Sequence, residues 1–159
     1  MLINSGSAPV PPRVVAAFGE EIRQIDLPSG RGNVRALSVD RNGTVATVHA
    51  VWAEQGRIVD ESYDVLAFHD GNSWHEERLP EQCEVKALVH DGLDRALVIC
   101  MNDNPFVLLR RPEGFSRWPF PCFGEIGPVA MTQDGRIAIA CNGLYDWPFR
   151  GSVVFARFR

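Results

Sequence analysis

The sequence predicts an all-β protein built from repeated antiparallel sheets, and three observations support this fold class. No helix-length window keeps the i, i+3, i+4 apolar spacing of a helix without an interrupting Gly or Pro. β-branched and apolar runs instead alternate with Asn-Gly, Asp-Gly and Pro turns, a pattern typical of short strands. Three segments also resemble one another at intervals of roughly 40 to 50 residues, which indicates a repeat of several strands.

The repeat is clearest in three segments that begin at Ala36, Ala87 and Ala130. Each opens with an apolar strand, turns at residues that include Asp and Gly, and continues into a second, more apolar strand. A third strand follows in each unit, as YDVLAFHD, PFVLLRRP and GSVVFARF. The first two units then add a polar fourth strand, SWHEERLP and FSRWPFP, whereas the third reaches Arg159 before one begins.

The N-terminal region resembles the end of such a unit. VVAAFGE, residues 14–20, is similar to VLAFHDG, and EEIRQIDLP, residues 20–28, shares its polar character and Leu-Pro ending with HEERLP. We therefore expect residues 14–28 to complete a sheet. Residues 1–13, rich in Ser, Gly and Pro, are expected to form a flexible arm.

Hydrophobicity falls from the inner to the outer strands of each unit. ALVICM and IAIAC are apolar at every position, as strands covered on both faces should be, whereas HEERLP carries the charges that protect a sheet edge. This gradient is typical of a β-propeller, in which four-stranded blades pack against one another. We predict one propeller-like domain over residues 14–159, with units at 34–80, 85–121 and 127–159. The alternative is a monomeric β-sandwich or irregular barrel.

SVDRNGTVAT, MTQDGRIAIA and FHDGNSWHEERLP are similar to blades of bacterial β-propellers of the two-component-regulator sensor type. In that family a D-G-x-x-W turn precedes the outer strand, and a D-G or N-G turn joins the first two strands. The resemblance covers residues 14–159 and implies a bacterial propeller-like protein. The third unit departs from the pattern because it has no matching Trp, and PEGFSRW replaces HDGNSW in the second.

Ring closure predicts an assembly. A closed propeller needs at least about four blades, and this sequence supplies three units and a fraction. An open stack would leave apolar faces in water. We therefore expect a homo-oligomer, most simply a dimer, in which two chains complete one ring.

The longer connections on one side of the predicted sheets form the expected binding face, because binding residues concentrate on such loops. These connections are residues 51–64, 101–105, 119–127 and 142–151. Their aromatic and acidic side chains give the candidate ligand- or partner-binding residues Trp52, Tyr63, Asp103, Tyr145, Asp146, Trp147 and Phe149. The aromatic segment 145–149 could stack on a sugar ring or anchor a protein. The alternative is that Trp147 and Phe149 pack back onto their own sheet or seal the contact between two chains.

Motifs for catalysis or cofactor binding are absent from the sequence. There is no G-x-S-x-G, Walker or G-x-G-x-x-G segment, and the four histidines lack metal-ligand spacing. We therefore expect a non-catalytic module without metal or cofactor, which binds a protein, a small molecule or a carbohydrate. The alternative is a propeller-type hydrolase, similar to a glycosidase or lactonase, with loop carboxylates near the ring axis.

Composition argues against two partner classes. The net charge of −4 disfavours nucleic acid, and MLINSGSAPVPPR has no apolar run long enough for a signal peptide or membrane span.

The four cysteines, Cys83, Cys100, Cys122 and Cys141, include no Cys-x-x-Cys pair, and two of them lie in apolar runs. The sequence therefore predicts free, buried thiols in a cytoplasmic protein.

Overall fold

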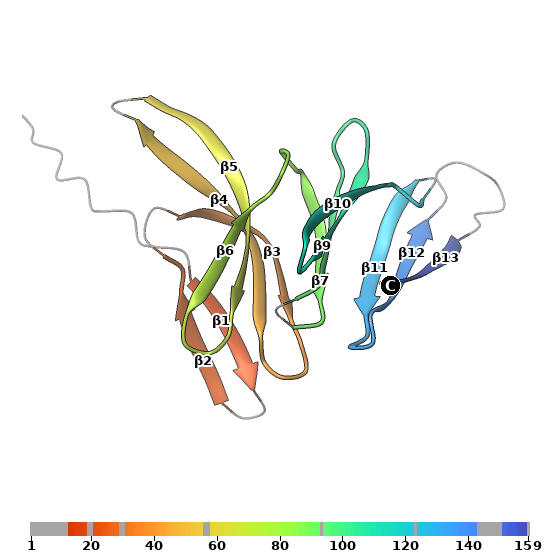
Figure 1. The fold of residues 1–159 in the computed structure, drawn as a ribbon, viewed down its shortest axis with the longest axis horizontal. Coiled ribbons are helices and arrows are strands. Elements are labelled where there is room, and N and C mark those ends of the chain that lie inside the picture. The colour runs from red at the N-terminus through yellow and green to blue at the C-terminus, as the bar shows by residue number, and fades with distance from the viewer. Residues whose placement is uncertain are drawn as a thin grey trace, which may run out of the picture.

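The computed structural model describes residues 13–18, 21–28, 31–55, 58–92, 94–122, 124–142 and 151–158. Within these ranges the chain forms strands and no helix, so the prediction of an all-β protein is confirmed (Figure 1). No helix in this part of the chain could therefore cross a membrane. The strands form four antiparallel sheets.

The four sheets follow the order of the chain, and within each sheet consecutive strands are neighbours. The N-terminal hairpin consists of β1 (Arg13–Phe18) and β2 (Glu21–Asp26). The first sheet consists of β3 (Arg31–Val39), β4 (Val45–Gln55), β5 (Ile58–His69) and β6 (Trp74–Arg78). The second sheet consists of β7 (Val85–His90), β8 (Ala96–Cys100), β9 (Phe106–Arg111) and β10 (Gly114–Pro119). The third sheet consists of β11 (Glu125–Met131), β12 (Arg136–Asn142) and β13 (Gly151–Arg157).

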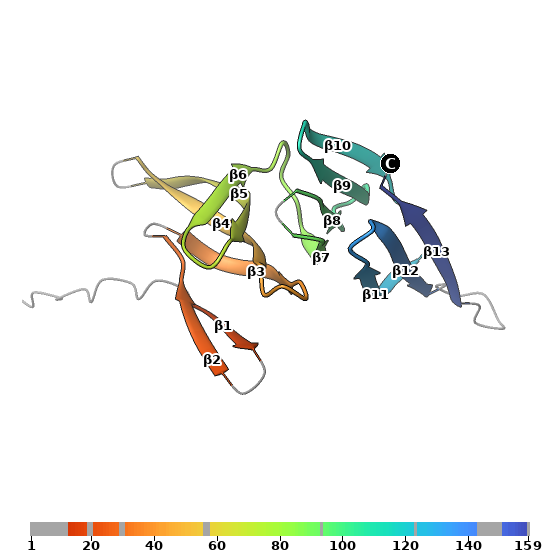
Figure 2. The same ribbon diagram turned by 60° about the horizontal axis from the view of Figure 1, so that its bottom comes forward.

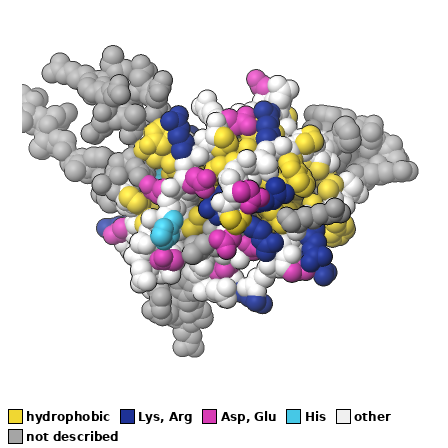
Figure 3. Space-filling model, in the orientation of Figure 1, with side chains coloured by type: hydrophobic (Ala, Val, Ile, Leu, Met, Phe, Trp, Pro, Cys, Tyr) yellow, Lys and Arg dark blue, Asp and Glu magenta, His cyan; other side chains and the backbone are white. Residues whose placement is uncertain are grey.

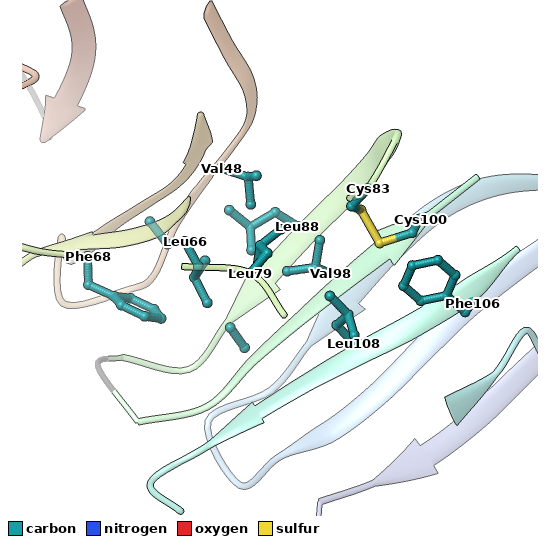
Figure 4. Close-up of a cluster of buried hydrophobic side chains, with 12 residues drawn as sticks. Val48, Leu66, Phe68, Leu79, Cys83, Leu88, Val98, Cys100, Phe106 and Leu108 are labelled. Carbon is teal, nitrogen blue, oxygen red and sulfur yellow. A yellow bond between two sulfur atoms is a disulfide. The ribbon is translucent and has the colours of Figure 1, made fainter. Parts of the chain in front are cut away.

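The first and second sheets pack face to face around one apolar core. Val48 and Leu66 of the first sheet lie against Leu88, Val98 and Leu108 of the second (Figure 4). All five are buried, so this contact excludes water along the middle of both sheets. We call the side of each sheet that points to the next sheet in sequence its forward face, and the opposite side its backward face.

The second and third sheets form a second core of the same kind. Leu97 and Ile99 on the forward face of the second sheet pack with Ile137 and Ile139 on the backward face of the third. Strand β8 is therefore covered on both faces, which explains why every residue in it is apolar and buried. The three sheets form an open stack, and the described strands do not close into a ring (Figure 2).

The first strand of each sheet lies on the inside of the stack, with β7 between β3 and β11. The turns that follow these strands are equivalent, because each is closed by a backbone bond between residues four apart. The N–H groups of Asp40, Asp91 and Thr132 donate to carbonyl oxygens at 3.0, 3.2 and 2.8 Å. This register corrects the alignment of the third repeat by two residues, so that Ala130 is equivalent to Ser38 rather than to Ala36. Alignment by sequence matched Asp134 with Asp40. In the third turn, however, the Thr132 hydroxyl accepts the backbone N–H that an Asp carboxylate accepts in the first turn.

The cysteines are paired, so the prediction of free thiols is wrong. Cys83 is bonded to Cys100 and Cys122 to Cys141. In each case a cysteine in the segment before a sheet is bonded to one near the end of that sheet's second strand. In the second sheet the residues that follow the two cysteines are also hydrogen-bonded, because the Met101 N–H donates to the Glu84 carbonyl at 2.9 Å. Sequence spacing could not reveal this pairing, because the partners meet only once the first two strands have formed a hairpin.

The N-terminal hairpin forms a two-stranded sheet of its own. It packs on the backward face of the first sheet, where Val14 and Ile25 contact Val45 and Trp74. The indole Nε1–H of Trp74 also donates to the Asp26 carbonyl at 2.9 Å. The expectation that residues 14–28 complete a larger sheet is therefore not met within the described part of a single chain.

Candidate functional site

A cavity of about 410 Å³ lies where the turns after β3, β7 and β11 converge. We call it the turn cavity. Its polar residues come from all three sheets and are Ser38, Asp40, Arg41, His90, Asp91, Thr132 and Gln133. Convergence of polar groups from separate elements on one concave region is the general property of a ligand site.

One carboxylate oxygen of Asp40 stabilises the first turn, and the other has no hydrogen-bond partner among the described residues. Its Oδ1 accepts hydrogen bonds from the backbone N–H groups of Asn42 at 2.9 Å and Thr44 at 2.7 Å, which is the usual role of an Asp in a tight turn. Gly43 completes the turn at a φ of 82°, a conformation that favours glycine. The second oxygen, Oδ2, is buried and has no hydrogen-bond partner in the described part of the chain. A buried carboxylate oxygen of this kind is a strong acceptor for a ligand's donor group.

Asp91, the equivalent residue of the second sheet, has its charge compensated within the protein. Its carboxylate forms an ion pair with Arg95. The Arg95 Nη2 group also donates to the Gln133 carbonyl of the third sheet at 3.0 Å. Arg95 therefore joins two of the turns that line the cavity, and Asp40 provides the more available acceptor.

His90 joins the first and second sheets at the cavity wall. Its Nε2 lies 3.1 Å from the Thr44 carbonyl oxygen, and its Nδ1 lies 2.9 Å from Ser38 Oγ. Because a carbonyl can only accept, Nε2 carries the proton and the neutral ring accepts the Ser38 hydroxyl proton at Nδ1. Burial lowers the pKa of His90, although the Thr44 hydrogen bond and the charges of Asp40 and Asp91 oppose the shift. The ring is therefore neutral at neutral pH.

The Ser38–His90 pair has the contact of a nucleophile with a base, but its surroundings favour a structural role. A carboxylate usually orients the base in such a pair, whereas the carbonyl of Thr44 occupies that position here. Across the described ranges, no three His, Cys, Asp or Glu side chains lie close enough together to hold a metal ion.

Two predicted binding residues lie in strands rather than in a loop. Residues 51–64 continue the hairpin of β4 and β5, in which Val51 pairs with Tyr63 and Trp52 pairs with Ser62. The long-loop interpretation of this segment is therefore wrong. The apolar, β-branched character of β4 persists to Trp52, so backbone pairing extends almost to Gly56. The Tyr63 ring lies under the Arg78 guanidinium, whose carbon is 4.5 Å from the ring centroid.

The other predicted residues are not brought to the turn cavity. Asp103 is exposed in the connection between β8 and β9, at the opposite end of the second sheet from the turn that holds Asp91. Tyr145, Asp146, Trp147 and Phe149 lie outside the described residues, so their role stays a prediction. Sequence reasoning placed the candidate site at the longer loops and did not single out the tight turns that line the turn cavity. The sequence does contain a signal for these turns, because a polar residue follows the first strand of every repeat. The signal becomes visible only when the third repeat is shifted by two positions in the alignment.

Comparison with known proteins gives no relative for this chain. A scan against family models, a search of curated proteins and a search of solved structures each returned no match.

Proposed function

We propose that this protein is a non-catalytic binding module of the propeller type, which takes a small polar ligand in the turn cavity. The observation that carries this proposal is the convergence of polar residues from three repeats on one cavity, whose lining includes Asp40 with a buried carboxylate oxygen that has no hydrogen-bond partner in the described part of the chain. The stacking of the sheets, with β3, β7 and β11 innermost, supports a propeller-like arrangement in which this cavity lies near the axis.

The lining indicates a ligand rich in hydroxyl groups. Asp40 Oδ2 needs a donor. The Thr132 hydroxyl donates to Asp134 Oδ1 and accepts from the Arg136 N–H, so toward a ligand it offers an acceptor lone pair. Aromatic side chains do not line this cavity among the described residues, so hydrogen bonding rather than ring stacking would provide recognition. A mono- or disaccharide, or a related polyol, fits this chemistry.

Calorimetric titration with a panel of sugars and polyols tests the proposal, and Asp40→Asn is the decisive variant. The Asn oxygen preserves the turn bonds to Asn42 and Thr44, but an NH₂ group replaces the free acceptor. We expect affinity to fall at least about tenfold, which corresponds to about 1.4 kcal/mol.

Asp70→Asn is the matched control. Asp70 Oδ1 also accepts from two turn amides, Asn72 at 2.8 Å and Ser73 at 2.9 Å, but Asp70 does not line the turn cavity. Its replacement should leave affinity unchanged. Equal loss in both variants, or binding that survives Asp40→Asn, would refute the assignment of Asp40.

The disulfides also bear on where the module works. Disulfides persist in oxidising compartments and are uncommon in the cytoplasm. Because two pairs occupy equivalent positions in the second and third sheets, we favour an oxidising location over the cytoplasmic one expected from the sequence.

A further inference from the structure

The third sheet exposes a position that is buried in the other two sheets. Phe68, Leu109 and Phe155 are structurally equivalent, because they pair with Ala46, Leu97 and Ala138 at the same step of each sheet. Their exposed fractions are 4%, 1% and 79%.

A second position on the forward faces repeats the pattern. Leu66, Val107 and Val153 are equivalent and are 0%, 3% and 54% exposed. The next sheet of the stack covers the first two, whereas no described strand forms a further sheet over Val153. Apolar side chains also gather on the surface toward the third sheet in Figure 3.

The backward face of the first sheet also exposes apolar residues whose equivalents are buried in the second sheet. Leu37 and Val39 of β3 are each 45% exposed, whereas their equivalents in the second sheet, Leu88 and His90, are only 6% and 5% exposed. In the second sheet, these positions are covered by the forward face of the sheet before it. The exposed apolar positions on β3 and β13 thus mark the two ends of one stack.

The N-terminal hairpin covers only part of this backward face. It packs over Val45 and Trp74 and leaves β3 open, while its own Val15 and Ile22 are 62% and 74% exposed. At the other end of the stack, β13 pairs with β12 on one side, and no described strand pairs with its other edge. The equivalent strands β5 and β9 have β6 and β10 on that edge. An unpaired edge of this kind readily accepts a further strand.

We propose that a second copy of this chain packs head to tail on the third sheet. Its Leu37 and Val39 cover Val153 and Phe155, and its N-terminal hairpin lies along the open edge of β13. This contact continues the interfaces already present between the sheets of one chain, with forward face on backward face. The hairpin and β13 lie at opposite ends of the molecule in both ribbon views, so the two surfaces must come from different copies (Figures 1 and 2).

Two such contacts close two copies into one ring. A head-to-tail contact forms a ring when the rotation between copies closes and an open filament when it does not. The ring buries both exposed ends of each stack, which removes the apolar surface that an isolated copy leaves in water.

Light scattering coupled to size-exclusion chromatography tests the assembly on the 159-residue chain. We expect a mass twice the 17.7 kDa of one chain, independent of concentration. Phe155→Asp and Leu37→Asp should each halve the mass. Trp118→Asp is the control, since Trp118 is 40% exposed on β10 of the second sheet, away from both end faces. Circular dichroism of each variant confirms that the β-structure is intact.

Mixing the two single variants distinguishes head-to-tail packing from a symmetric contact. A mixed pair retains one intact interface, between native Phe155 of one copy and native Leu37 of the other, so part of the sample should regain the doubled mass. A wild-type chain that stays monomeric, either variant retaining the full dimer, a mixture that stays monomeric, or a mass that grows without limit would each overturn the closed head-to-tail ring.

Discussion

At the scale of single residues, the histidines show how burial decides a role that sequence leaves open. His49 lies within an apolar run, and its spacing from the other histidines does not suit a metal site. It is fully buried, with Nδ1 3.0 Å from Thr47 Oγ1 and Nε2 3.1 Å from Glu76 Oε1. It also stands at the position that Cys100 and Cys141 occupy in the other sheets. The sequence did not predict a role for His90, because its hydrogen-bond partners Ser38 and Thr44 lie in a different repeat.

His90 makes stability depend on pH. Burial lowers its pKa from 6.5 in the folded protein, so the unfolded chain takes up a proton first as the pH falls. The free energy of unfolding should therefore decrease as the pH drops below about 6.5, by at most about 1.4 kcal/mol for each pH unit, the limit for one proton.

Urea denaturation at several pH values measures this effect. His90→Asn removes the titrating group and keeps a polar side chain, so the wild-type decrease in acid should be reduced in the variant. The difference between the two proteins isolates His90 from the other three histidines. Identical pH profiles would contradict the assigned role of His90.

At the scale of elements, the strands were largely predictable and the cross-strand pairings were not. The unbroken apolar pattern of β8 indicated burial on both faces, and the HDGN turn between His69 and Trp74 was correctly placed between a third and a fourth strand. The length of β4 and β5 was missed because the polar residues near their hairpin end resemble loop residues. The two-residue shift of the third repeat was missed because the Thr132 hydroxyl and the Asp40 carboxylate each accept from the backbone N–H four residues further along, so either residue type can form this turn.

The disulfide between Cys83 and Cys100 should stabilise the second sheet. The two cysteines are 17 residues apart in the sequence. For a loop of this size, removing the bond lowers the free energy of unfolding by about 3 kcal/mol. The double variant Cys83→Ala with Cys100→Ala should unfold at lower denaturant concentration by that amount.

A reducing agent separates the bond from the side chains. Reduction should destabilise the wild-type chain more than the double variant, which retains only the pair Cys122–Cys141. Equal sensitivity of both proteins to reduction would show that the Cys83–Cys100 bond does not contribute.

At the scale of the whole molecule, the order of the sheets brings together residues that are far apart in the sequence. The gradient of hydrophobicity predicted sheets covered on both faces, and the second sheet has this arrangement. The position of the turn cavity, the binding surface we propose, did not follow from the same gradient, because it depends on which end of the stacked sheets brings polar side chains together. Loop length favoured the end that holds Asp103, whereas the cavity lies at the tight turns of Asp40, Asp91 and Thr132.

Chemical-shift mapping by NMR during titration with a sugar from the panel tests the turn cavity most directly. The account predicts that the largest changes fall on the backbone amides of Asp40, Asp91 and Thr132, from three separate sheets. Changes concentrated at Asp103 and in residues 143–150, with the three turns unaffected, would place the ligand at the opposite end and contradict the account.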